Sequence, residues 1–194
     1  MTAQPDIFTN VHKGIRSALF QACAALGRAA DDPTLGARAR ALLRDALHFV
    51  AHHGDNEDTL LVPLLREHAP AVCERIERAH ATVQPPLERL RTALEHAPPP
   101  SLYADACSFL ALYLEHMREE EADLEPLIRA RVPAPDLATF GPRSVARTSP
   151  ADQRLMLGWM LPAMTPPEAQ ALLARLPAEL QEELVARGVA VDEG

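Results

Sequence analysis

Two copies of one short pattern contain the residues best suited to chemistry. In each copy a histidine is followed four positions later by a glutamate, and the glutamate is followed six positions later by a proline. The copies are His53-x-x-x-Glu57 with Pro63, and His116-x-x-x-Glu120 with Pro126. Because positions i and i+4 lie on one face of a helix, each copy would direct an imidazole and a carboxylate toward one point. Such a pair of nitrogen and oxygen donors is typical of a metal site.

Two further histidines precede these patterns. His12 and His80 each lie one predicted helix before a copy, so the order histidine, then histidine-glutamate, occurs twice. All six side chains fall on the apolar faces of their helices, where an unpaired imidazole or carboxylate is costly to bury. Two neighbouring metal ions would offset that cost, with each glutamate bridging both ions. The predicted ligands are His12, His53, Glu57, His80, His116 and Glu120.

Four helices are needed to position these side chains. Hydrophobic residues at helical spacing predict them over residues 6–30, 37–65, 70–96 and 102–131. Pro33 lies in a predicted turn between the first two. Pro85 and Pro86 interrupt the third helix, and proline both removes a backbone donor and restricts the residue before it. We therefore expect a kink or a break at that point.

The last third of the chain has a different composition. Residues 133–150 are rich in proline and turn-forming residues, which predicts a linker. Residues 151–194 are predicted to form a C-terminal extension of short helices. Met156, Trp159, Met160 and Met164 give this extension a large apolar surface, which we interpret as a cap on the preceding helices or a dimer contact. The chain is thus divided into a helical domain over 1–132, a linker and the extension.

Composition excludes several classes of function. The chain has 194 residues, of which 47% are hydrophobic and 24% charged, as in ordinary globular proteins. Its net charge of −8 and its scattered basic residues argue against nucleic acid as a partner. No stretch approaches the roughly 18–20 apolar residues of a membrane span, and the first residues lack the features of a signal peptide. We expect a cytoplasmic protein without a membrane partner.

The three cysteines do not form a recognisable framework. Cys23, Cys73 and Cys107 are odd in number and show no CxxC spacing. Each falls on the apolar face of its predicted helix. We interpret them as small core residues.

The ordered set His12, His53-x-x-x-Glu57, His80, His116-x-x-x-Glu120 resembles the hemerythrin-like (HHE cation-binding) family. The proline and leucines after each glutamate and the early segment VHKGIR are also similar to that family, over about residues 6–131. The resemblance implies an all-α fold, an up-down-up-down four-helix bundle, with an additional short helical C-terminal segment outside it. It also implies two iron ions in a non-haem di-iron centre, with the four histidines as terminal ligands and the two glutamates as bridges.

The chain differs from the oxygen carriers of this family at one ligand. Their third helix supplies two histidines a turn apart, whereas Gln84 stands one turn after His80 and Ile76 one turn before it. Glutamine is a poor iron ligand, so one iron would have a further open position for water, peroxide or nitric oxide. This argues against simple reversible oxygen carriage and leaves room for oxygen or peroxide chemistry or for sensing.

Several neighbouring residues are weaker candidates for ligands. His52 lies about 100° around the helix from His53, so we expect it to be exposed or to contact a ligand. Glu121 would fit the His-x-x-x-x-carboxylate spacing of the oxygen carriers, but a solvated face is the preferred interpretation. Tyr113, one turn before the second histidine-glutamate pair, could donate a hydrogen bond to a bound dioxygen species, although a packing role is commoner.

A ferritin-like site is an alternative to this ligand set. Glu77-x-x-His80 matches the Glu-x-x-His pattern of ferritin-like di-iron proteins, but those need two copies and two more glutamates. Only one copy is present, and this alternative would leave the other three histidines in the core without a role.

Three functions from different classes follow. The first is a di-iron protein that binds or senses dioxygen, nitric oxide or iron, with the signal passing through the C-terminal helices. The second is a di-iron peroxidase or oxidase that uses an open coordination position. The third, an iron-free helical protein, is disfavoured by the repeated pattern. The expected partners are a small ligand such as dioxygen, nitric oxide or peroxide, and a second copy or another protein at the C-terminal helices.

Overall fold

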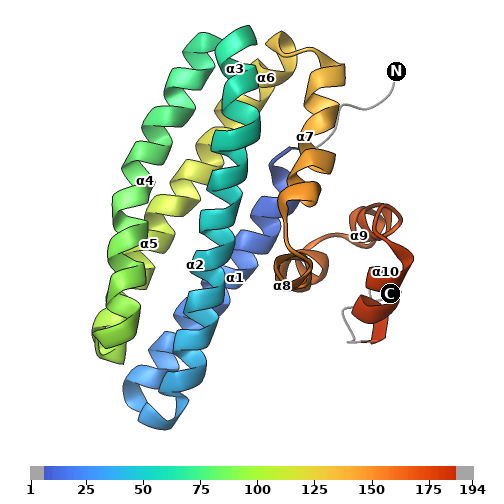
Figure 1. The fold of residues 1–194 in the computed structure, drawn as a ribbon. Helices are drawn as coiled ribbons and strands as arrows, with labels where there is room; N and C mark the ends of the chain where they lie inside the picture. The colour runs from blue at the N-terminus through green and yellow to red at the C-terminus, as the bar shows by residue number, and fades with distance from the viewer. Residues whose placement is uncertain (1–6, 187–194) are drawn as a thin grey trace.

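The computed structural model describes residues 7–186, and all regular elements within that range are helical (Figure 1). The predicted helix start at residue 6 and the end of the extension, 187–194, lie outside the described residues. The first two thirds of the chain consist of α1 (Thr9–Asp31), η1 (Pro33–Leu35), α2 (Gly36–Asn56), η2 (Glu57–Leu61), α3 (Val62–His68), α4 (Pro70–His96), α5 (Pro99–Glu119), η3 (Glu120–Leu124) and α6 (Glu125–Arg131).

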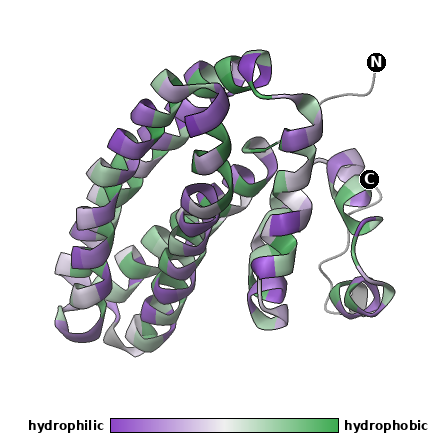
Figure 2. Cartoon of the chain, turned by 45° about the horizontal axis from the view of Figure 1, so that its top comes forward, coloured by the Kyte–Doolittle hydropathy of each residue, from purple (hydrophilic) through white to green (hydrophobic). Residues whose placement is uncertain are grey.

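The long helices α1, α2, α4 and α5 lie side by side, with α1 against α2 and α5, and α4 against α5 and α2. Each carries both hydrophobic and hydrophilic residues (Figure 2), as expected of helices that bury one face. The main apolar cluster between them includes Leu19, Leu43, Leu87 and Phe109. Burying one such side chain contributes about 1.5–3 kcal/mol, so this cluster is a principal source of stability.

A second apolar cluster lies beyond the first along the same helices, and polar residues separate the two. On each long helix the chain passes from one cluster to the other across a predicted ligand. His12 lies between Phe8 and Ile15, His53 and Glu57 between Val50 and Leu60, His80 between Ile76 and Val83, and His116 and Glu120 between Tyr113 and Leu124. The fold therefore brings together, between the two apolar clusters, the polar residues that interrupt the apolar face of each of the four helices.

Each histidine-glutamate pattern ends in a short π-helical segment that the sequence analysis did not predict. These segments, η2 and η3, begin at Glu57 and Glu120 and are each closed by an i→i+5 backbone hydrogen bond. Pro63 and Pro126 lie at the second position of the following α-helix. A proline in a continuous α-helix would clash with the carbonyl four residues earlier, and one wide turn relieves that clash.

Of the kink or break expected at Pro85 and Pro86, the break is not present. Helix α4 continues from Pro70 to His96 with both prolines inside it. Val83 and Leu87 on either side are buried in the main cluster, whereas Pro85 is exposed. The apolar contacts on both sides thus offset the cost of about 3 kcal/mol of proline in a helix interior.

The interval that we predicted to be a linker, 133–150, is helical over most of its length. Helix α7 (Ala134–Arg147) buries Leu137 and Phe140 in the second apolar cluster. The extension continues through α8 (Pro150–Met160), η4 (Leu161–Ala163), α9 (Pro166–Leu173) and α10 (Ala178–Ala186), which share a small apolar cluster of their own. Helix α8 packs against α1, and Met156 is buried in the main cluster.

Gly14 permits the contact between α1 and α8. An added Cβ there would lie 2.6 Å from Met160 Cγ, 3.1 Å from Met160 Cα and 3.1 Å from Phe49 Cε1. We expect Gly14→Val to separate the two helices and to cost about 1–3 kcal/mol of unfolding free energy, measured by thermal denaturation. Gly158→Val on α8, where an added Cβ meets nothing within 4 Å, is the matched control. Equal destabilisation by both variants would contradict this role for Gly14.

Candidate metal centre

All six predicted ligands come together at the level between the two apolar clusters. His12 comes from α1, His53 from the end of α2, His80 from α4 and His116 from α5. Glu57 and Glu120 are the first residues of the two π-helical segments. All are buried except His80, whose side chain is 13% exposed. They form two groups of four donors, and both groups contain both glutamates.

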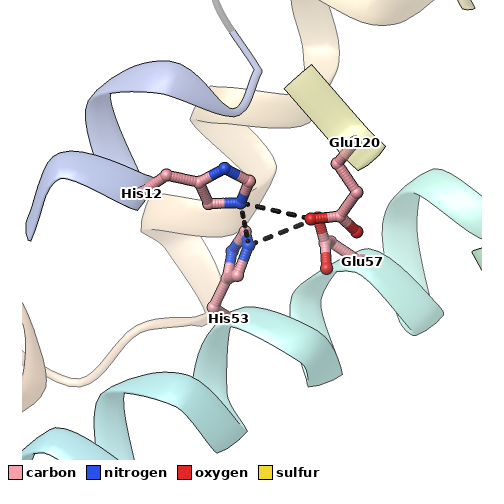
Figure 3. Close-up of side chains that lie close together, drawn as sticks. All are labelled: His12, His53, Glu57 and Glu120. Carbon is pink, nitrogen blue, oxygen red and sulfur yellow. Dashed lines mark hydrogen bonds and ion pairs between the residues drawn. The ribbon is translucent and has the colours of Figure 1, made fainter. Parts of the chain in front are cut away.

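The first group consists of His12, His53, Glu57 and Glu120 (Figure 3). The Nε2 atoms of His12 and His53 are 3.0 Å apart. His12 Nε2 lies 3.3 Å from Glu120 Oε2, and His53 Nε2 lies 3.3 Å from Glu57 Oε1. The four side chains thus point at one small volume.

The second group consists of His80, His116 and the same two glutamates. His80 Nε2 lies 3.3 Å from Glu57 Oε2, and His116 Nε2 lies 3.4 Å from Glu120 Oε1. His80 Nε2 is also 3.8 Å from Glu120 Oε1. Each glutamate therefore turns one oxygen to the first group and the other oxygen to the second.

The unpaired donor atoms fit a pair of metal ions. Both carboxylate oxygens of Glu57 and of Glu120, and Nε2 of His80, are buried without a hydrogen-bond partner. Leaving such groups unpaired in the interior is costly, whereas a cation satisfies them directly. Nitrogen and oxygen ligands about 2.1 Å from one ion are roughly 3.0–3.4 Å from each other, which most of the observed separations match. Imidazole with carboxylate suits first-row transition metals such as iron.

Two further carboxylates orient the histidines from outside. The carboxylate of Asp58 accepts a hydrogen bond from His80 Nδ1 at 2.6 Å, and Glu121 accepts one from His12 Nδ1 at 2.9 Å. These bonds place the Nδ1 proton outward and leave Nε2 free to face a metal, as in many metal sites. Arg16 holds Glu121 through two bonds of 2.7 and 2.9 Å.

The arrangement of these outer carboxylates repeats like that of the ligands. In both copies an acidic residue follows the glutamate directly and bonds to a histidine of another helix. From the sequence Glu121 was predicted to lie on a solvated face, and Asp58 was not predicted to have a role. The acidic residue shared by the two copies was the signal that could have identified both.

The other residues weighed as ligands lie outside both groups. His52 Nδ1 accepts a hydrogen bond from the Asn56 amide at 3.0 Å, and the exposed Gln84 donates to Glu88 at 3.1 Å. Tyr113 is buried, with its ring centre 5.0 Å from that of His116. Of the residues considered as ligands, only the six predicted ones belong to the two donor groups.

The glutamate of the ferritin-like alternative does not reach the site. Glu77 forms an exposed ion pair with Arg66 at 2.7 Å, and its side chain is 46% exposed. The pattern Glu77-x-x-His80 thus contributes one donor to the centre rather than two.

The charges of the centre favour protons on two histidines. Burial opposes protonation of His12, but Glu120 and Glu121 outweigh it and raise the pKa of His12 to about 9. In the same way Asp58 and the two glutamates overcome burial and raise the pKa of His80 to about 12. Metal ions at this centre would compete with these protons, because an imidazole must be neutral at the nitrogen that binds a metal.

The remaining ligands differ in pKa for identifiable reasons. Burial lowers the pKa of His53 and of His116, so both are neutral. Burial and the neighbouring charge of Glu120 raise the pKa of Glu57 to about 7. Burial opposes ionisation of Glu120, but the nearby imidazoles of His12 and His80 outweigh it, so the pKa of Glu120 is lowered. Two buried carboxylates this close titrate as a pair, which is typical of a functional site.

Comparison with known families agrees with this geometry. Residues 5–128 match the family model of the hemerythrin HHE cation binding domain. The chain belongs to this family, and the matched range includes all six residues of the two donor groups. Searches of curated proteins and of solved structures gave no match. Among the described residues no helix is both long and apolar enough to cross a membrane.

Proposed function

We propose that residues 1–132 form an up-down-up-down four-helix bundle that holds two iron ions, one in each donor group. The four histidines would be terminal ligands, and Glu57 and Glu120 would bridge the ions. One observation carries this proposal: the two groups share the same two carboxylates and use a different oxygen of each. Membership of a cation-binding family supports it.

The proposed activity is the binding or sensing of dioxygen, nitric oxide or iron. Bound iron would supply the affinity for such ligands and the capacity for one-electron chemistry. The protein's own residues prepare the centre for it. Asp58 and Glu121 fix the orientation of two histidines, and Arg16 holds Glu121 in place. The apolar clusters on both sides exclude water from the buried carboxylates.

Contacts of the C-terminal helices favour sensing. Lys13, next to His12, donates to Glu168 of α9 at 2.6 and 2.7 Å. Arg147 of α7 bonds to Asp55 at 2.7 Å and to Thr59 at 3.3 Å, on either side of Glu57. A shift of the first donor group would therefore be transmitted directly to the extension. We also propose that these helices bind a second copy or another protein, and that the protein is cytoplasmic.

The second candidate is a di-iron peroxidase or oxidase. It is favoured by a cavity of about 300 Å³ that His80 and His116 line, since a substrate could reach the centre through it. The two candidates differ in a measurable way, because a sensor binds its ligand once per centre whereas a peroxidase consumes peroxide repeatedly.

Metal analysis of the native protein is the first test. We expect about two iron ions per chain, one for each donor group, and an optical spectrum of a diferric centre after exposure to air. A sensor should then bind nitric oxide or dioxygen once per centre, whereas a peroxidase should consume peroxide over many turnovers. Native protein that carries no iron, or only one ion per chain, would contradict the proposal.

A further inference from the structure

Two of the three cysteines lie next to each other between α1 and α5, which pack together. Cys23 of α1 is buried in the main apolar cluster, and Cys107 of α5 packs against the same cluster but is only partly buried. Burial, followed by the charge and the hydrogen bonding of Cys107, raises the pKa of Cys23 to about 12. Because hydrogen bonding requires contact, the two thiols are direct neighbours.

A second contact between the same two helices supports this pairing. An added Cβ at Gly27 would lie 3.3 Å from Cε2 of Tyr103, so the tyrosine ring rests on the glycine. Gly27 lies one turn after Cys23 on α1, and Tyr103 lies one turn before Cys107 on α5. Residues one turn apart share a face of a helix, so Cys107 faces Cys23 as Tyr103 faces Gly27.

The two thiols differ in access from the surface. Cys23 is 7% exposed, whereas Cys107 is partly buried and lies beside Tyr103, whose side chain is 41% exposed and hydrogen-bonds to the Cys107 thiol. The third cysteine, Cys73, is 3% exposed and belongs to the second apolar cluster, where its thiol donates to the carbonyl oxygen of Val62 at 3.8 Å. A reagent in solution therefore meets Cys107 first.

We propose that Cys23 and Cys107 form a reversible disulfide by exchange with a low-molecular-weight disulfide of the glutathione type. The bond ties α1, which carries His12, to α5, which carries His116. It makes the packing of these two helices depend on the redox state of the surrounding thiols. The bond needs no metal, so the inference is independent of the proposed function.

The exchange takes place in two steps. The Cys107 thiolate attacks one sulfur of the small disulfide and forms a mixed disulfide, and the thiolate that leaves takes up the proton given up by Cys107. Cys23 then attacks the Cys107 sulfur, which forms the Cys23–Cys107 bond and releases the second small thiol with the proton of Cys23. The two cysteines are oxidised by two electrons in total, and the small disulfide is reduced to two thiols.

The test treats the reduced native protein with oxidised glutathione and measures free thiols, intact mass and Tm. Two of the three thiols should disappear without a bound glutathione, and peptide mapping should find Cys23 linked to Cys107. Because the bond closes a long loop of the chain, Tm should rise by about 5–10 °C. Excess dithiothreitol should restore both the thiols and the original Tm.

Single variants test the order of the two steps. Cys23→Ala should keep one glutathione on Cys107 and show no rise in Tm, and Cys107→Ala should stay unmodified because its two remaining thiols are buried. Cys73→Ala, the matched control, should form the disulfide as the native protein does. Three free thiols in the treated native protein, a stable glutathione adduct on it, disulfide-linked dimers, or an unchanged Tm would each overturn the inference.

Discussion

Replacing either of the two glutamates that face both donor groups should remove both of the proposed iron ions rather than one. Glu57→Gln or Glu120→Gln replaces a charged carboxylate that faces both donor groups with an amide that keeps only one oxygen and has lost the negative charge. The amide that remains is neutral and a weaker ligand. We expect the iron content to fall from about two ions per chain to well below one, measured by elemental analysis. His53→Ala removes an imidazole from the first group alone and should affect chiefly that position.

An exposed glutamate of α5, the helix that leads into Glu120, serves as the control. Glu115→Gln changes a side chain that is 67% exposed and forms an ion pair with Arg118. It should leave the iron content unchanged, because exposed ion pairs contribute little to structure or stability. If Glu120→Gln retained one fully occupied ion, the glutamates would be terminal ligands and the bridging arrangement would be wrong.

The convergence of the six side chains could be predicted from the sequence because two strong local rules agree. Spacing of four places histidine and glutamate on one helical face, and the hydrophobic periodicity locates that face toward the core. What the sequence did not predict was the backbone register at Glu57 and Glu120. Side-chain spacing is nearly the same in an α-turn and a π-turn, and only the proline six residues later indicates the difference. The role of Glu121 could not be predicted either, because its partial burial depends on Arg16, which lies on another helix.

Local propensity failed where tertiary packing outweighs it. Of the kink or break expected at Pro85 and Pro86, the break does not occur, because the flanking residues of α4 are buried in the main cluster. Residues 133–150 have the composition of a linker, yet Leu137 and Phe140 find a buried surface that stabilises a helix. In both cases the deciding contacts are with distant parts of the chain, which composition does not describe.

Removal of the metal should destabilise the protein, and more strongly at pH 9 than at pH 7. Ions that bind only the folded state stabilise it by about 2.7 kcal/mol at a hundredfold excess over Kd. In a chain of this size that corresponds to a fall of roughly 5–10 °C in Tm on chelation. Thermal unfolding followed by circular dichroism, with and without a chelator, measures it.

The pH dependence follows from the two histidines with raised pKa. In the metal-free protein His12, with a pKa of about 9, and His80, with a pKa of about 12, are stabilised by protons that the unfolded chain releases near pH 6.5. That stabilisation is complete below pH 6.5 and is lost as the pH rises toward the folded-state values, so the metal-free protein weakens between pH 7 and 9. In the metal-bound protein cations replace these protons, and their affinity increases as protons cease to compete. The difference in Tm should therefore grow with pH. The double variant His53→Ala/His116→Ala, which lacks a ligand in each group, should show no response to the chelator at either pH. A difference that stays constant or shrinks from pH 7 to pH 9 would show that His12 and His80 do not exchange protons for metal.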